Sequence, residues 1–164
     1  MDLIRLIRFT KSGTEVNTTV LGAAIAWTGG RKKVLVLSNG HHGSTIIFPM
    51  DLCRWMHVKS SSPPPFTSMN LPHDFVVAPF NNLAETKAIV DALPKDNLAA
   101  IMIEPVQGTA GCRPALPEFM KYLRETADDL RALLLIDEVM TSQLGPSGAT
   151  AGLGLKADLM TLGK

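Results

Sequence analysis

The chain has 164 residues, of which 46% are hydrophobic and 19% are charged, and its formal net charge is +1. This length and composition are typical of one soluble globular domain, and the near-zero charge gives no support for binding to nucleic acid or to an anionic membrane. No apolar run approaches the roughly 20 residues of a membrane-spanning helix, and no secretory signal is evident. Cys53 and Cys112 are far apart in sequence, so we expect reduced thiols and a cytoplasmic protein, unless a targeting segment preceded this sequence.

The first predicted strand covers residues 3–9 and leads to a helix predicted from Val16 to Trp27. Ser12-Gly13-Thr14 stands where this helix would begin. Because a helix N-terminus presents backbone N–H groups and a positive dipole, this triplet predicts a phosphate site. The alternative is an ordinary helix cap, since Ser or Thr followed by an acid such as Glu15 is common at helix starts. From this stretch alone the cap is the simpler interpretation.

The next predicted strand, Val34–Leu37, leads into a loop with two adjacent histidines. A planar imidazole at the carboxyl end of a strand can stack on a flat heterocycle, which is the role we predict for His41. We predict that His42 is an ordinary hydrogen-bonded histidine. A solvated turn and a metal site are the alternatives for this pair. No third ligand stands at a supportive spacing, so no metal site is predicted.

The rest of the chain alternates short apolar runs with helix-forming segments. Residues 44–73 predict little regular structure, and the proline- and serine-rich part at 60–73 predicts a flexible surface loop. Strands are predicted at 74–78, 98–103, 132–136 and 158–162, and helices at 83–93 and 118–130. Near-continuous apolar strands are what a parallel sheet covered on both faces requires. The predicted fold class is therefore α/β, with three α/β/α layers and a mostly parallel sheet.

Two of these strands end in a charged residue. Asp137 follows residues 132–136, and Lys164 closes the segment after residues 158–162. Ligands of open α/β sheets lie outside the carboxyl ends of the strands, so this carboxylate and this amine would face the same ligand. A pyridoxal phosphate site requires an acid for the pyridinium nitrogen and a lysine that forms an imine with the aldehyde. Taken alone, charged strand ends are more often structural than catalytic.

Several short motifs are spread in order over nearly the whole chain. They are Arg8-Phe9, Ser12-Gly13-Thr14-Glu15, Thr28-Gly29, His42-Gly43, Glu104-Pro105-Val106, Gly111-Cys112, Asp137-Glu138-Val139-Met140-Thr141 and Asp158-Leu159 to Gly163-Lys164. Together they resemble the large domain of class III aminotransferases. Within that family the series is most similar to glutamate-1-semialdehyde 2,1-aminomutase-like proteins.

The resemblance implies a partial large domain of the fold-type I pyridoxal-phosphate-dependent transferases, with pyridoxal 5'-phosphate as the cofactor. Lys164 matches the lysine that forms the Schiff base, and Asp137 matches the acid paired with the pyridinium nitrogen. Val139 matches the residue that packs on one ring face, and Ser12-Gly13-Thr14 matches the phosphate cup. The residues Glu15, His42 and Glu104 stand in matching motifs, and we assign them supporting roles.

The activity implied by the resemblance is that of a transaminase or aminomutase. Such an enzyme moves an amino group between an amino acid and an aldehyde or keto acid, or between neighbouring carbons of one substrate. Its partners are a small amino acid or amino aldehyde and a second identical subunit. Relative to the family, we expect this chain to be a segment without the N-terminal part, the end of the large domain and the small C-terminal domain. We therefore expect the isolated chain to be inactive.

Two other functions remain as alternatives. One is a truncated pseudoenzyme that acts as an interaction partner for full-length subunits. The other is a nucleotide-binding α/β domain, which is much weaker because neither a Gly-x-Gly-x-x-Gly segment nor a Walker-type loop opens a helix.

Three residues depart from the family pattern. His41 stands where the family has Tyr or Phe, and its smaller stacking face predicts a lower cofactor affinity. Thr109 stands where many members have Glu, which fits the aminomutase-like branch better than ornithine- or aminobutyrate-type enzymes. Gln143 stands where Arg is expected.

Overall fold

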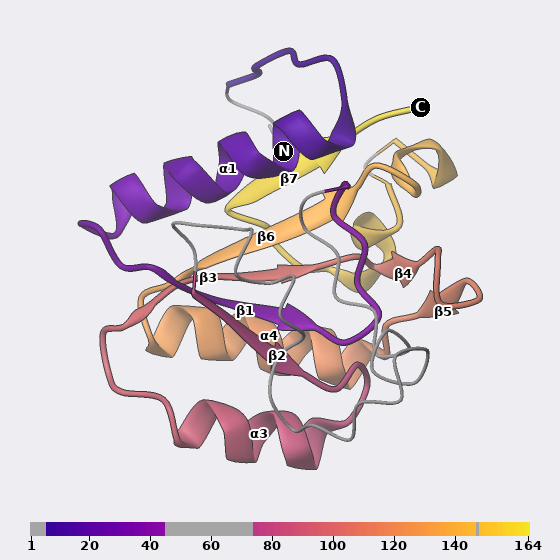
Figure 1. Cartoon of the computed structure of the whole chain (residues 1–164). Helices are drawn as coiled ribbons and strands as arrows, with labels where there is room; N and C mark the ends of the chain where they lie inside the picture. Colours follow the sequence, from indigo (N-terminus) through magenta and orange to yellow (C-terminus); the bar gives the residue numbers. More distant parts are fainter. Residues whose placement is uncertain (1–5, 45–73, 147) are drawn as a thin grey trace, which may run out of the picture.

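A five-stranded parallel sheet forms the centre of the molecule, in a computed structural model that describes residues 6–44, 74–146 and 148–164. The strands follow the spatial order β2-β1-β3-β6-β7 (Figure 1). Their bounds are Lys33–Leu37 (β1), Asp74–Ala78 (β2), Leu98–Ile103 (β3), Leu133–Glu138 (β6) and Leu159–Leu162 (β7). Every neighbouring pair in this sheet runs parallel.

Helices cover both faces of the sheet. Helix α1 (Gly13–Trp27) lies on one face, and helices α3 (Leu83–Asp91) and α4 (Pro117–Asp129) lie on the other (Figure 1). The predicted three-layer α/β architecture is thereby confirmed. None of the helices in the described part of the chain is long and apolar enough to cross a membrane.

Local hydrogen bonds explain where the helices begin. Ser12 caps α1, because its Oγ accepts a hydrogen bond from the N–H of Glu15 at 3.2 Å. Asn82 caps α3 in the same way, through the N–H of Glu85 at 3.1 Å. Helix α1 therefore begins at Gly13, three residues before the predicted start at Val16. The β-branched residues after Gly13 are poor helix formers, but the cap stabilises the first turn despite them.

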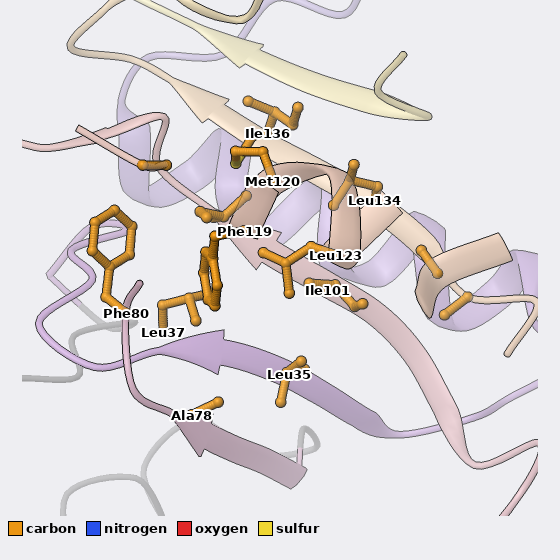
Figure 2. Close-up of a cluster of buried hydrophobic side chains, with 14 of the residues drawn as sticks. Leu35, Leu37, Ala78, Phe80, Ile101, Phe119, Met120, Leu123, Leu134 and Ile136 are labelled. Carbon is orange, nitrogen blue, oxygen red and sulfur yellow. The ribbon is translucent and has the colours of Figure 1, made fainter. Parts of the chain in front are cut away.

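The core has one hydrophobic cluster on each face of the sheet. The larger cluster lies beneath α4, where Figure 2 shows Leu123 directed toward Ile101 and the Phe119 ring directed toward Leu37. The rings of Phe80 and Phe119 meet edge to face with centroids 6.0 Å apart. On the opposite face, Leu21 and other α1 residues pack against β1 and β3. All six residues of β3 are buried because this central strand is covered on both faces.

The order in which the chain adds strands to the sheet reverses at β1. After β1 it moves to β2 on one side, and after β2 it moves to β3 on the other side of β1. The carboxyl ends of β1 and β3 therefore flank a topological switch point, where open α/β sheets form their ligand crevice. The loops at this point begin with Ser38 and Glu104.

The prediction of a strand at residues 3–9 is wrong for its described part. Residues 6–10 have no regular structure, and Leu6 and Phe9 are 93% and 90% exposed. An apolar segment becomes a strand only if it finds a pairing partner, and the described sheet ends at β2 and β7 without pairing to it. The flexible loop predicted at 60–73 and residues 3–5 lie outside the described residues.

A small antiparallel pair of strands lies between β3 and α4. Strand β4 (Val106–Gln107) pairs with β5 (Arg113–Pro114). Two short 3-10 helices, Ser142–Leu144 and Thr150–Leu153, lie between β6 and β7.

Replacement of Phe119 by alanine should lower the free energy of unfolding by about 3–5 kcal/mol, because it leaves a cavity beneath α4. Lys121→Ala on the same helix is the matched control, since its side chain is 73% exposed and its pair with Glu125 is a surface pair. Urea unfolding of the full chain measures both variants. Equal losses for Phe119→Ala and Lys121→Ala would contradict the packing described for α4.

Candidate cofactor site

A pocket of about 410 Å³ lies at the carboxyl ends of the strands, next to the switch point. Its walls come from the start of α1, the loops after β1 and β3, the turn after β6 and the end of β7. The predicted site residues that line it are Gly13, Thr14, His41, Glu104, Asp137, Val139 and Lys164. Ser12, Glu15 and His42 are not among its lining residues. The structure thus brings together residues that are up to 151 positions apart in sequence (164 − 13).

Asp137 is buried at the centre of this site, with 4% exposure. Its Oδ2 accepts hydrogen bonds from Asn17 Nδ2 and pairs with His42 Nδ1, both at 2.8 Å. Its Oδ1 accepts hydrogen bonds from the N–H of Val139 and from Thr161 Oγ1, both at 3.1 Å. Both carboxyl oxygens are therefore held by two donors each, which fixes the plane of the carboxylate.

These contacts decide the charge of Asp137. Burial by itself raises the pKa of a carboxyl group, but the hydrogen bond and charge of His42 oppose that effect. Together with the hydrogen bonds from Val139 and Asn17 they bring the pKa of Asp137 below its ordinary value. The site therefore contains a buried carboxylate that is ionised at neutral pH.

The start of α1 and the loop after β1 are in close contact. Thr14 Oγ1 accepts a hydrogen bond from the N–H of Ser44 at 3.0 Å. Gly43 has a φ of +108°, and a Cβ at this position would lie 2.5 Å from Thr14 Cα. Glycine is therefore required at position 43, both for this backbone conformation and for the approach of the loop to α1. The interpretation of Ser12 as a helix cap is confirmed, and Gly13 and Thr14, the first residues of α1, line the pocket.

Lys164 enters the pocket from the end of β7. Its Nζ contacts Met140 Sδ, and its carbonyl oxygen accepts a hydrogen bond from Gln143. Ser142 Oγ donates to the carbonyl of Gly163 at 2.6 Å. A Cβ at Gly163 would lie 3.2 Å from Val139 Cγ1. The backbone that carries the lysine is thus held against the turn after Asp137.

His41 and Glu104 form a second unit on the wall of the pocket. The backbone N–H of His41 donates to Glu104 Oε2 at 2.9 Å. Burial, followed by the positive charges of His42 and Lys164, lowers the pKa of His41, although Asp137 opposes this. Burial raises the pKa of Glu104, and the charge of His42 and the N–H of His41 only partly offset it. Because its pKa is lowered, the His41 ring is uncharged at neutral pH.

Glu138 points away from Asp137 and anchors the segment between β6 and β7. Its carboxylate is fully buried and accepts hydrogen bonds from the hydroxyls of Thr141 and Thr150. The backbone N–H groups of Ala149 and Thr150 also donate to it, at 3.1 and 2.8 Å. This network fixes the turn that carries Val139 and Met140.

Three features of the site were not predicted from the sequence: Asn17, Thr161 and the contacts of Glu138. A polar residue within a helix or a strand is usually exposed, so residue type alone gave no signal for Asn17 or Thr161. One usable signal exists for Asn17, because it stands four residues before Leu21 and thus on the buried face of α1. The described residues contain no group of three side chains suited to a metal ion.

Comparison with known proteins explains this arrangement. The model of the family "Aminotransferase class-III" matches residues 4–164. The chain belongs to the class III aminotransferase family. A β-phenylalanine transaminase from Variovorax paradoxus is 41% identical over 98% of this chain, and a glutamate-1-semialdehyde 2,1-aminomutase from Ignicoccus hospitalis is 36% identical over 98%. These alignments cover 33% and 38% of the two relatives, so the chain spans about a third of their length.

Solved structures of this class have the same fold. The V. paradoxus β-phenylalanine aminotransferase superposes with a TM-score of 0.80 at 41% identity, over 96% of this chain and 33% of that protein. A transaminase with bound pyridoxal phosphate superposes with a TM-score of 0.75 at 29% identity, over 96% and 36%. The family is enzymatic, and its members imply pyridoxal phosphate as the cofactor.

The residues of the pocket fit this cofactor. A phosphate suits the N-terminus of α1, whose first residues, Gly13 and Thr14, line the pocket. The pyridinium nitrogen requires a buried anion, which Asp137 provides. The aldehyde requires a primary amine in the same pocket, and among its lining residues this is Lys164.

Replacement of Glu104 by glutamine should make the stability of the protein less sensitive to pH. The raised pKa of Glu104 means that the native state holds this proton more tightly than the unfolded state, so wild-type stability falls as pH rises from the ordinary glutamate pKa to the raised one. Glutamine cannot ionise, but it can still accept the hydrogen bond from His41 N–H.

We therefore expect Glu104→Gln to be more stable than the wild type at neutral pH, with a smaller difference below the ordinary glutamate pKa. Urea unfolding at several pH values measures this. Two results would contradict the effect of burial on Glu104: a stability difference between Glu104→Gln and the wild type that does not change with pH, or a variant that is less stable than the wild type only at neutral pH.

Proposed function

We propose that this chain forms the cofactor-binding part of a pyridoxal-phosphate-dependent enzyme that transfers the amino group of an amino acid. The observation that carries the proposal is the presence of an ionised, buried Asp137 in the same pocket as Lys164. A carboxylate that is held by donors on both oxygens, beside an amine, suits a ligand with a cationic ring nitrogen and an electrophilic carbon.

Each part of the cofactor has a counterpart in the pocket. The N-terminus of α1, with Gly13 and Thr14, would hold the phosphate, and Ser12 supports it by capping the helix. Asp137 would pair with the ring nitrogen. Val139 and His41 would pack on the ring, and Lys164 would hold the aldehyde carbon covalently. When bound, pyridoxal phosphate supplies an aldehyde that captures amines and a ring that accepts the electron pair of the bond broken at the substrate.

The residues of this chain control protons at two places. Asp137 remains ionised, so it would stabilise a proton on the cofactor's ring nitrogen. His42 donates to Asp137 and thereby fixes its orientation, which is the supporting role that we assign to it. Lys164 Nζ would act as the base that takes the proton from the substrate carbon and as the acid that gives it back. Glu104 supports the site by holding the backbone of His41 in place.

The comparisons favour transamination over mutase chemistry for the whole protein. Identity to the V. paradoxus transaminase is 41%, against 36% to the I. hospitalis aminomutase. We therefore propose a transaminase that acts on an amino acid such as β-phenylalanine, with a 2,1-aminomutase as the second candidate because Thr109 replaces the usual glutamate. Since the chain spans about a third of these relatives, turnover would require the rest of the enzyme and a second subunit. A pseudoenzyme that only binds full-length subunits is the remaining alternative.

Incubation with pyridoxal phosphate, reduction with borohydride and peptide mapping by mass test this proposal directly. We expect one pyridoxyl group per chain, confined to Lys164, and none in Lys164→Ala. Asp137→Asn keeps the shape of the side chain and removes its charge, so it should weaken cofactor binding roughly 10- to 100-fold, the usual effect of losing a charged hydrogen-bond partner.

Lys121→Ala is the control for this experiment, because Lys121 is exposed on α4 and does not line the pocket. It should leave the labelling unchanged. Labelling scattered over surface lysines, or no labelling, would contradict the cofactor site and favour the pseudoenzyme.

Replacement of His41 by phenylalanine should tighten the binding of pyridoxal phosphate roughly 2- to 10-fold. A phenyl ring offers a larger stacking face, and aromatic pairs contribute about 0.5–1.5 kcal/mol beyond their buried area. His41→Leu adds apolar area without an aromatic face and is the matched control. Equilibrium titration monitored by cofactor absorbance measures all three proteins. Equal or weaker binding by His41→Phe would contradict the stacking role of residue 41.

A further inference from the structure

Asn17 is a buried residue of helix α1 to which the proposed function assigns no role. Its side chain is 1% exposed and lines the pocket. Its Nδ2 donates two hydrogen bonds, one to Asp137 Oδ2 at 2.8 Å and one to the carbonyl oxygen of His42 at 3.1 Å. Within the described part of the chain, its Oδ1 is buried and has no hydrogen-bond partner.

The neighbours of Asn17 determine which way its amide faces. Asp137 presents a carboxylate and His42 presents a carbonyl, and both groups only accept hydrogen bonds at these atoms. A flipped amide would place its oxygen against two other oxygens, so the observed orientation is the only favourable one. The unpaired Oδ1 is a consequence of this orientation. A hydrocarbon side chain of the same size would fill the space without leaving an unpaired polar atom. What Asn17 adds to packing is therefore its two donated hydrogen bonds.

Helix α1 also carries the proposed phosphate site. Gly13 and Thr14 lie in its first turn, and Asn17 follows one turn later, about 6 Å along the helix axis from Gly13 at 1.5 Å per residue. The same helix thus lines the proposed phosphate site with Gly13 and Thr14 and contacts Asp137, the acid of the proposed ring site, through Asn17.

We propose that Asn17 is a positioning residue that fixes the Asp137 carboxylate relative to helix α1, and so sets the distance between the two ends of the cofactor site. The proposal rests on the proposed function. Asn17 acts on the ring end through Asp137 and has no part in phosphate binding. The geometry therefore assigns to α1 the role of aligning the acid with the phosphate site.

Equilibrium binding of three probes to the full chain tests this role. The probes are pyridoxal phosphate, pyridoxal without phosphate, and inorganic phosphate. Asn17→Leu keeps the size of the side chain and removes the donor. It should therefore weaken the binding of both pyridoxal probes roughly tenfold, the usual scale for one hydrogen bond to a charged group. Binding of inorganic phosphate should stay within about twofold, since the first turn of α1 is unchanged.

A double-mutant cycle distinguishes positioning from a general structural role. If Asn17 acts through Asp137, then Asn17→Leu combined with Asp137→Asn should bind the pyridoxal probes no more weakly than Asp137→Asn alone. Thr19→Ala is the control on the same helix. Its hydroxyl bonds the carbonyl of Glu15 on the exposed side, so binding of all probes should be unchanged. Asn17→Ala, which adds no apolar bulk beside the carboxylate, is measured alongside in case Asn17→Leu unfolds.

The outcomes distinguish failure of the positioning role from failure of the proposed function. Three results would overturn the positioning role: equal loss of phosphate and pyridoxal binding, fully additive effects of Asn17→Leu and Asp137→Asn in the cycle, or wild-type affinity in both Asn17 variants. Failure of the wild-type chain to bind either pyridoxal probe would instead overturn the proposed function on which the inference rests.

Discussion

The hydrogen bonds to the Asp137 carboxylate hold the site together. A buried carboxylate is unfavourable unless donors compensate the loss of water, and here donors come from four different segments of the chain. Asn17 belongs to α1, His42 to the loop after β1, Val139 to the turn after β6, and Thr161 to β7. Because they share one acceptor, these segments can reach their native positions only together. The same contacts keep the carboxylate ionised, so one cluster provides both the local structure and the proposed chemistry.

The end of β6 anchors the chain in two directions, because successive side chains of a strand point to opposite sides. Asp137 faces α1 and the pocket, whereas Glu138 binds the segment that follows and fixes the turn with Val139. The histidine loop after β1 also reaches this strand end, where His42 pairs with Asp137 although β3 lies between β1 and β6 in the sheet. Gly43 permits that loop to touch Thr14, so the proposed phosphate and ring sites lie side by side.

Most of the fold could be predicted from the sequence, because buried parallel strands are continuous apolar runs and each run here ends at a charged or small residue. The prediction failed at residues 3–9, since an apolar run does not reveal whether a neighbouring strand exists. The pocket residues Asp137 and Lys164 could be predicted from their places at strand ends and from the family resemblance. Asn17 and Thr161 could not, because their importance depends on contacts between residues far apart in the sequence.

Hydrogen bonds from His42, Val139 and Asn17, together with the charge of His42, outweigh burial and keep Asp137 ionised. A carbon-13 NMR titration of the Asp137 carboxyl group in the cofactor-free chain tests this balance most directly. We predict that the carboxyl carbon titrates below the ordinary pKa of an aspartate, so that the group is charged throughout the neutral range. A midpoint at or above the ordinary value would contradict this account, because the carboxyl group would then be governed by burial and not by its hydrogen bonds.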